Sequence, residues 1–71
     1  MTTKPMLHKD HIEELVDAYG LERMIGVLAE IAIEKSGHIS ENWQDEGLAK
    51  RWERAANKLA VLAGNPLMDG L

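Results

Sequence analysis

The strongest constraint on this sequence is an apolar stripe that runs at helical spacing through residues 21–40. Val27 and Ile33 flank the stripe on opposite sides, so the apolar arc is too wide for one neighbouring helix. The pattern predicts a central helix that contacts both other helices and keeps surface for a second subunit. The stripe itself consists of Leu21, Met24, Ile25, Leu28, Ile31, Ala32 and Ile39.

A shorter helix is predicted over residues 9–19. Asp10 and Glu13 have the spacing of a capping box, in which each side chain bonds a free backbone amide at the helix start. Gly20 follows, and glycine is typical of the position just past a helix C-terminus. The apolar stripe of this helix consists of Ile12, Leu15, Val16 and Tyr19.

The third predicted helix covers residues 43–63. Asn42 is expected to cap its start, and Asp45 and Glu46 place negative charge in the first turn, where the helix dipole favours it. Pro66 lies just beyond the predicted end and stops the helix. The apolar stripe has heptad-like spacing and consists of Leu48, Trp52, Ala55, Leu59 and Leu62, with Ala49, Ala56 and Ala63 beside it.

These patterns predict an all-α fold with a single three-helix domain over residues 1–71. Helices 21–40 and 43–63 are expected to form an antiparallel hairpin because their connection is short, and the first helix is expected to pack across it. The remaining segments show no periodicity and are expected to be loose ends: 1–7 and 64–71.

The chain is small, with 71 residues, and it contains no cysteine. Domains of this size bury little apolar surface and commonly need disulfides, a metal or a partner subunit for stability. Without cysteine, disulfides and thiolate metal sites are excluded, which leaves idealised packing, another kind of metal site or a partner subunit. The N-terminal residues lack the apolar core of a secretory signal, and no segment is long enough to span a bilayer. We therefore expect a cytoplasmic protein.

A metal site is considered at Glu30, Glu34 and His38, which lie one helical turn apart on one ridge of the central helix. Carboxylate-bridged metal sites in helical bundles use a Glu-x-x-His pair and ligands from several helices. This sequence has no such pair, although a dimer can pool ligands from two chains. The favoured interpretation is a solvated ridge, and no cofactor is expected.

Lys50, Arg51, Arg54 and Lys58 gather on one side of the third predicted helix. A basic stripe is typical of phosphate binding, and a third helix can enter the major groove of DNA. The net charge of −4 at pH 7 and the neighbouring acids oppose such binding. The sequence favours a solvated or subunit-facing basic row, with nucleic-acid binding as an alternative.

The two tryptophans differ in phase. Trp52 lies on an apolar stripe and is expected in the core. Trp43 lies off that stripe, and we expect it to fold back over the end of the central helix. The alternative is an exposed interface anchor, because large aromatic side chains dominate binding hot spots. The candidate partner-binding residues are Trp43, Val27, Ile33 and Ile39.

Residues 30–56 read EIAIEKSGHISENWQDEGLAKRWERAA, with NWQDE and KRWERAA as the most distinctive parts. The segment resembles short uncharacterised helical proteins of bacteria and bacteriophages, and the resemblance covers about residues 20–63. The resemblance implies a phage or mobile-element gene product, many of which bind and redirect a host protein.

No serine, threonine or lysine is placed recognisably beside a histidine and an orienting acid, as nucleophilic catalysis requires. We therefore expect no enzyme. The sequence favours a noncatalytic interaction or regulatory protein that forms a homodimer and binds an unknown second protein. The alternatives are a small nucleic-acid-binding regulator and a metal-binding helical protein.

Overall fold

The computed structural model describes residues 8–71, so the predicted loose segment 1–7 lies outside the described residues. The described part confirms the all-α fold with three helices and no strands. The elements in chain order are α1 (Lys9–Tyr19), α2 (Leu21–Asn42), α3 (Glu46–Ala63) and a short 3-10 helix, η1 (Pro66–Met68).

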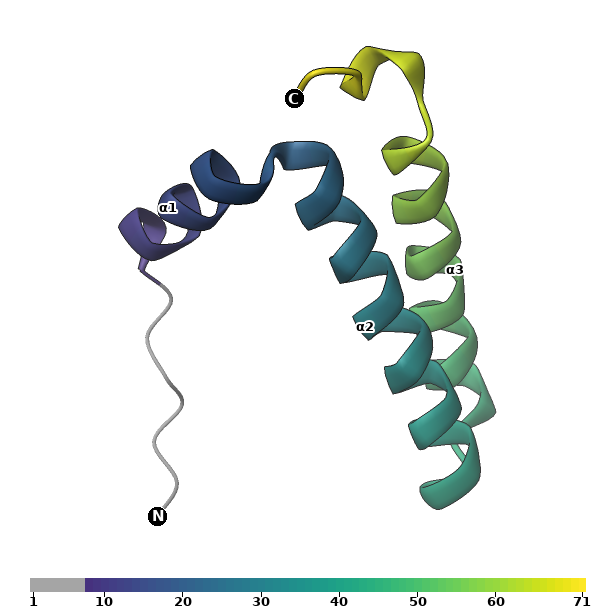
Figure 1. The fold of residues 1–71 in the computed structure, drawn as a ribbon. Helices are drawn as coiled ribbons and strands as arrows, with labels where there is room; N and C mark the ends of the chain where they lie inside the picture. Colours follow the sequence, from purple (N-terminus) through teal and green to yellow (C-terminus); the bar gives the residue numbers. More distant parts are fainter. Residues whose placement is uncertain (1–7) are drawn as a thin grey trace.

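Helices α2 and α3 lie side by side as an antiparallel hairpin (Figure 1). The seam between them is built from small side chains, because alanine and serine let two helix backbones approach closely. Ser36 Oγ donates a hydrogen bond of 2.8 Å to the Ala49 carbonyl, which fixes the register of the two helices. Near the turn, Ser40 Oγ donates to Glu46 Oε1 over 2.9 Å. The buried residues of the seam are Ala29, Ala32, Ser36, Ile39, Ala49 and Ala56.

The turn between α2 and α3 differs from the prediction. Helix α2 continues to Asn42, and the Asn42 side chain donates to the His38 carbonyl over 3.0 Å, so it does not cap the next helix. Gln44 takes a positive φ of 54°, which redirects the chain. Asp45 is the actual cap, because its Oδ1 accepts a 3.0 Å hydrogen bond from the Leu48 amide. Helix α3 therefore begins after the predicted residue 43.

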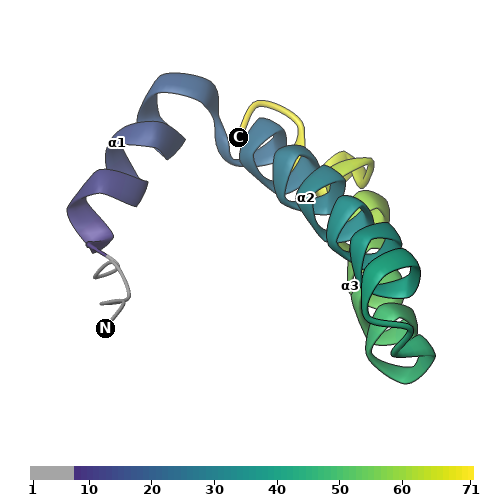
Figure 2. The ribbon, with the colours of Figure 1, turned by 90° about the horizontal axis from the view of Figure 1, so that it is seen from below.

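Helix α1 diverges from the hairpin and contacts only the N-terminal part of α2 (Figures 1 and 2). It contains no buried residue. The residue before it, His8, makes no side-chain capping bond, so the expected capping box of Asp10 and Glu13 does not supply the N-cap. Gly20 separates α1 from α2 with φ 89° and ψ 151°, a conformation that is essentially restricted to glycine.

The C-terminal segment, expected to be loose, is folded back against the rest of the chain. Asn65 caps η1 by accepting a hydrogen bond from the Leu67 amide, and Met68 is only 3% exposed. The Leu71 carbonyl accepts a hydrogen bond from the Leu21 amide at the start of α2. This contact joins the end of the described chain to the corner between α1 and α2.

The described helices form a layer only about one helix thick. The Cα positions extend over 39 × 35 × 12 Å, and their radius of gyration is 14.4 Å. A compact chain of this length has a radius of gyration of about 11 Å. No side chain in the described part is fully buried. The described part of the chain thus lacks the second layer of secondary structure that normally closes a hydrophobic core.

Candidate interaction surface

One side of α2 carries large apolar side chains that no other part of residues 8–71 covers fully. Leu28 directly precedes the buried Ala29, and Ile31 directly precedes the buried Ala32. One residue corresponds to about 100° around a helix, so these side chains lie roughly a quarter-turn from the seam. Both are exposed, Ile31 to 44%.

Helix α3 shows the same pattern, in which a large apolar residue directly precedes a small residue of the seam. Leu48 directly precedes the buried Ala49, and Leu62 directly precedes Ala63. Trp52 lies one turn beyond Leu48 and is 37% exposed, so it lies at the rim of the seam, whereas the sequence predicts it in the core. The apolar stripe predicted for this helix therefore faces solvent along one side.

The two stripes lie on the same face of the hairpin. Two antiparallel helices are related by a two-fold axis perpendicular to their common plane, so the same sequence offset from the seam leads to the same face. The hairpin therefore has a mainly apolar face, which also carries the exposed Lys35. Its apolar residues are Leu21, Met24, Leu28, Ile31, Leu48, Trp52, Ala55, Leu59 and Leu62.

The opposite face of the hairpin is mainly polar. The residues that directly follow the buried ones point to it, and they include Glu30, Gly37, Lys50 and Asn57. This face also carries two exposed apolar side chains, Ile33, which is 47% exposed, and Val61, which is 74% exposed and lies one turn beyond Asn57. The hairpin is thus amphipathic as a unit, with one apolar and one polar face.

The residues expected to bind a partner do not form one patch. Trp43 is 68% exposed, so its expected packing over the end of α2 is not observed. Val27 lies on the outer side of α2 beside the apolar face, and Ile33 lies on the polar face. Ile39 is only 7% exposed and belongs to the seam.

The metal candidates remain a row on the exposed side of α2. Glu34 and His38 line a shallow depression of about 300 Å³ together with Ile31 and Lys35. His38 Nδ1 lies 3.1 Å from the side-chain amide nitrogen of Asn42, Nδ2. Within residues 8–71, no group of three or more acidic or histidine side chains, Glu30 included, is arranged to hold a metal ion.

The basic candidates of α3 are all exposed, with Lys50 on the polar face and Arg51, Arg54 and Lys58 along the outer side. Glu53 lies among them, and it lines a depression of about 150 Å³ with Lys50, Arg54 and Asn57. The row is therefore interrupted by one acid. On the apolar face, Arg51 also lines a second depression of about 290 Å³ with Leu48, Trp52 and Ala55.

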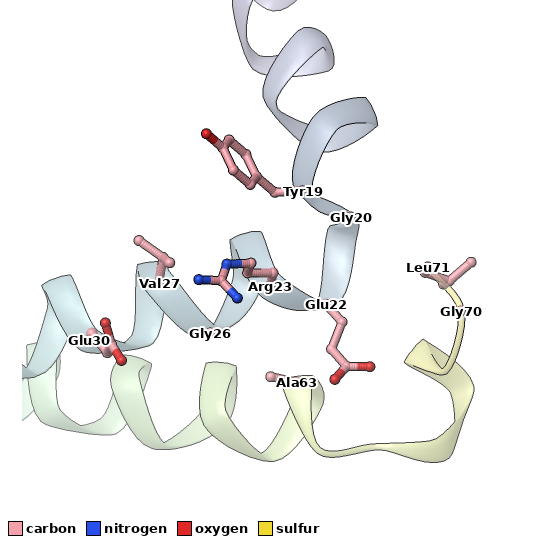
Figure 3. Close-up of a pocket in the computed structure, with 10 residues that line it drawn as sticks. All are labelled: Tyr19, Gly20, Glu22, Arg23, Gly26, Val27, Glu30, Ala63, Gly70 and Leu71. Atoms are coloured by element: carbon pink, nitrogen blue, oxygen red, sulfur yellow. The ribbon is translucent and has the colours of Figure 1, made fainter.

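A wide hollow of about 640 Å³ lies at the corner of the molecule (Figure 3). It is open to solvent, and its charged side chains are Glu22, Arg23 and Glu30. None of its lining residues is a serine, threonine, cysteine or histidine. The hollow therefore contains neither a hydroxyl or thiol nucleophile of these types nor a histidine to act as its base. A smaller apolar crevice of about 270 Å³ separates α1 from α2 and is lined by Leu15, Tyr19, Arg23, Met24 and Val27.

Fold and surface together describe a small all-α protein with an exposed amphipathic hairpin. No protein-family model matches this chain, and no curated protein or solved structure is significantly similar to it. None of the helices in the described part is long and apolar enough to cross a membrane.

Proposed function

We propose that this protein is a noncatalytic interaction protein whose first partner is a second copy of itself. The observation that supports this most strongly is the apolar face of a hairpin that is one helix thick. Exposed apolar surface of this extent marks a protein interface, because water exposure of large apolar side chains is unfavourable. A second layer supplied by another chain completes a four-helix core.

The surface area supports the same proposal. The chain exposes 6120 Å². A compact monomer of its mass, 7.9 kDa, exposes about 4,400 Å². The excess is larger than the roughly 800 Å² that one partner contributes to an interface of standard size. Each chain therefore has enough uncovered area for a stable homodimer.

Ile31 and Ile33 provide a matched pair for the test, because they have the same side chain and similar exposure on opposite faces of α2. Sedimentation equilibrium at micromolar concentration is expected to find a dimer. Ile31→Asp should raise the dissociation constant by about tenfold or more, since it places a charge in the apolar interface. Ile33→Asp should leave the constant within about a factor of two, because surface changes away from an interface have small effects. A monomeric wild-type protein would remove the homodimer from the proposal.

The resemblance of residues 30–56 to helical proteins of bacteria and bacteriophages supports a regulatory role in which the dimer binds a host protein. The absence of cysteine suits the reducing cytoplasm that we propose as its location. Capture experiments with the wild-type protein and both isoleucine variants separate the two interactions. A host protein retained by Ile31→Asp binds outside the apolar face.

The exposed basic row of α3 supports nucleic-acid binding as a second candidate function. Charge reversal at Arg51 and Arg54 should then abolish salt-dependent binding to duplex DNA. Absence of wild-type binding to DNA and RNA at low salt would exclude this candidate.

A further inference from the structure

We infer that α2 of one protomer lies on α3 of its partner in the homodimer, and that Glu34 pairs with Arg51 of the partner subunit. The inference rests on the proposed homodimer and specifies its arrangement. It is supported by the charges at the edges of the hairpin, by the register of the two helices and by two shallow depressions at matching heights.

Symmetry allows two ways of placing one apolar face on another. The two-fold axis lies in the interface and runs either along the helices or across them. If it runs along the helices, α2 covers α3 of the partner. If it runs across them, α2 covers α2 of the partner, and the α3 helices cover each other.

The outer edges of the hairpin carry opposite charges. The outer side of α2 carries Glu34 and Glu41, and Glu30 lies between this side and the polar face; all three are exposed. Its cations are Arg23, beside α1, and Lys35, which directly precedes Ser36 and therefore lies on the apolar face. The outer side of α3 carries Arg51, Arg54 and Lys58, all exposed.

These charges distinguish the two arrangements. An axis along the helices places the acidic edge of α2 beside the basic edge of α3 from the partner. An axis across the helices places acid beside acid and base beside base, and like charges at an interface oppose association. The charge pattern therefore favours α2 on α3.

The register of the hairpin identifies the pair. Ser36 lies level with Ala49, because its hydroxyl donates to the Ala49 carbonyl. The helices are antiparallel, so two residues back along α2 correspond to two residues forward along α3. Glu34 is therefore level with Arg51. A two-fold axis parallel to the helices preserves height, and it places Glu34 level with Arg51 of the partner subunit on both sides of the dimer.

The surface at this height is hollowed on both helices. The depression beside Glu34 on α2 has a volume of about 300 Å³, and the depression beside Arg51 on α3 has about 290 Å³. Their lining residues are centred at nearly the same level of the hairpin. Each can receive side chains that project from the other, and the guanidinium of Arg51 can reach the Glu34 carboxylate with two parallel hydrogen bonds.

A charge exchange tests the arrangement. Glu34→Arg alone and Arg51→Glu alone each place two like-charge pairs in the homodimer, one on each side. Each should raise the dissociation constant by about tenfold. The double variant Glu34→Arg/Arg51→Glu restores both pairs, so its dissociation constant should return to within about threefold of the wild-type value.

Mixing the two single variants tests whether these charged edges meet across the interface, and the homodimer affinities above decide which edge meets which. Both pairs are complementary in their heterodimer, while each homodimer contains only like charges. Native mass spectrometry should therefore find far more heterodimer than the random one-half. The matched control mixes Lys50→Glu with Glu53→Lys. Both residues lie on α3 outside the predicted pair of Glu34 and Arg51, so these variants should give a random mixture of homodimers and heterodimers. Circular dichroism of each variant verifies that its helices form.

The outcomes separate the inference from the proposed function. A wild-type monomer overturns both. A wild-type dimer whose affinity ignores the Glu34 and Arg51 changes retains the homodimer and overturns this arrangement. Single variants that dimerise as tightly as the wild type, while their mixture still favours the heterodimer, identify the arrangement with α2 on α2, because that arrangement places like charges together in the wild type and in both variants.

Discussion

Gly20 is the residue at which a side chain is least tolerable. Its φ of 89° and ψ of 151° are strained for any residue with a Cβ atom. A Cβ built there would also lie 2.9 Å from the carbonyl oxygen of Leu71. The sequence predicts a helix end at this glycine correctly, because helices commonly end at such residues. The contact with Leu71 could not be predicted, since no local pattern links two positions so far apart.

We expect Gly20→Ala to lower the free energy of unfolding by about 1–3 kcal/mol, because the backbone must strain or the Leu71 contact must open. Gly26 and Gly37 are the matched controls, since a Cβ at either position has nothing within 4 Å. Alanine at these helical positions should stabilise the protein by about 0.5–1 kcal/mol. Urea denaturation measures all three changes. Equal effects at the three glycines would contradict this account.

At the scale of elements, the periodicity of the sequence predicts three helices but not how their faces are shared. Leu28 and Ala29 are neighbours on one wide apolar arc, and both satisfy a helical pattern. The sizes of the two side chains decide which one is buried. The small side chain of Ala29 allows close approach of α3, and the large side chain of Leu28 stays exposed beside the seam. Trp52 is half-exposed for the same reason. A pattern detects an apolar side chain, but the depth of its burial depends on the neighbouring helix.

The start of α3 depends on Asp45, whose carboxylate accepts the Leu48 amide. We expect Asp45→Ala to lower the free energy of unfolding by about 1 kcal/mol, because one amide at the helix start loses its acceptor. Asn42→Ala removes a bond to the His38 carbonyl within α2 and should have a smaller effect. Thermal unfolding followed by circular dichroism compares the two variants. A larger loss of stability for Asn42→Ala than for Asp45→Ala would indicate that Asn42 caps α3, as the sequence predicts.

At the scale of the whole molecule, the exposed apolar face makes stability depend on association. If folding and dimerisation are coupled, a hundredfold rise in protein concentration should stabilise the folded dimer by about 2.7 kcal/mol. We expect the melting temperature to rise with concentration for the wild-type protein and for Ile33→Asp. The melting temperature of Ile31→Asp should be lower than that of the wild type at every concentration, because its dimer is weaker. A wild-type melting temperature independent of concentration would contradict the coupling.

The bond between the Leu21 amide and the Leu71 carbonyl has a consequence for the order of folding. The turn at Gln44 brings α2 and α3 together through contacts between residues close in sequence, such as Ser40 with Glu46. The Leu21 bond instead closes a long loop, which costs more chain entropy. The contacts between α2 and α3 should therefore form in order, from the turn toward the open end of the hairpin. The Leu21 amide should form its hydrogen bond last. Hydrogen exchange at this amide should therefore be the first to detect local opening of the hairpin.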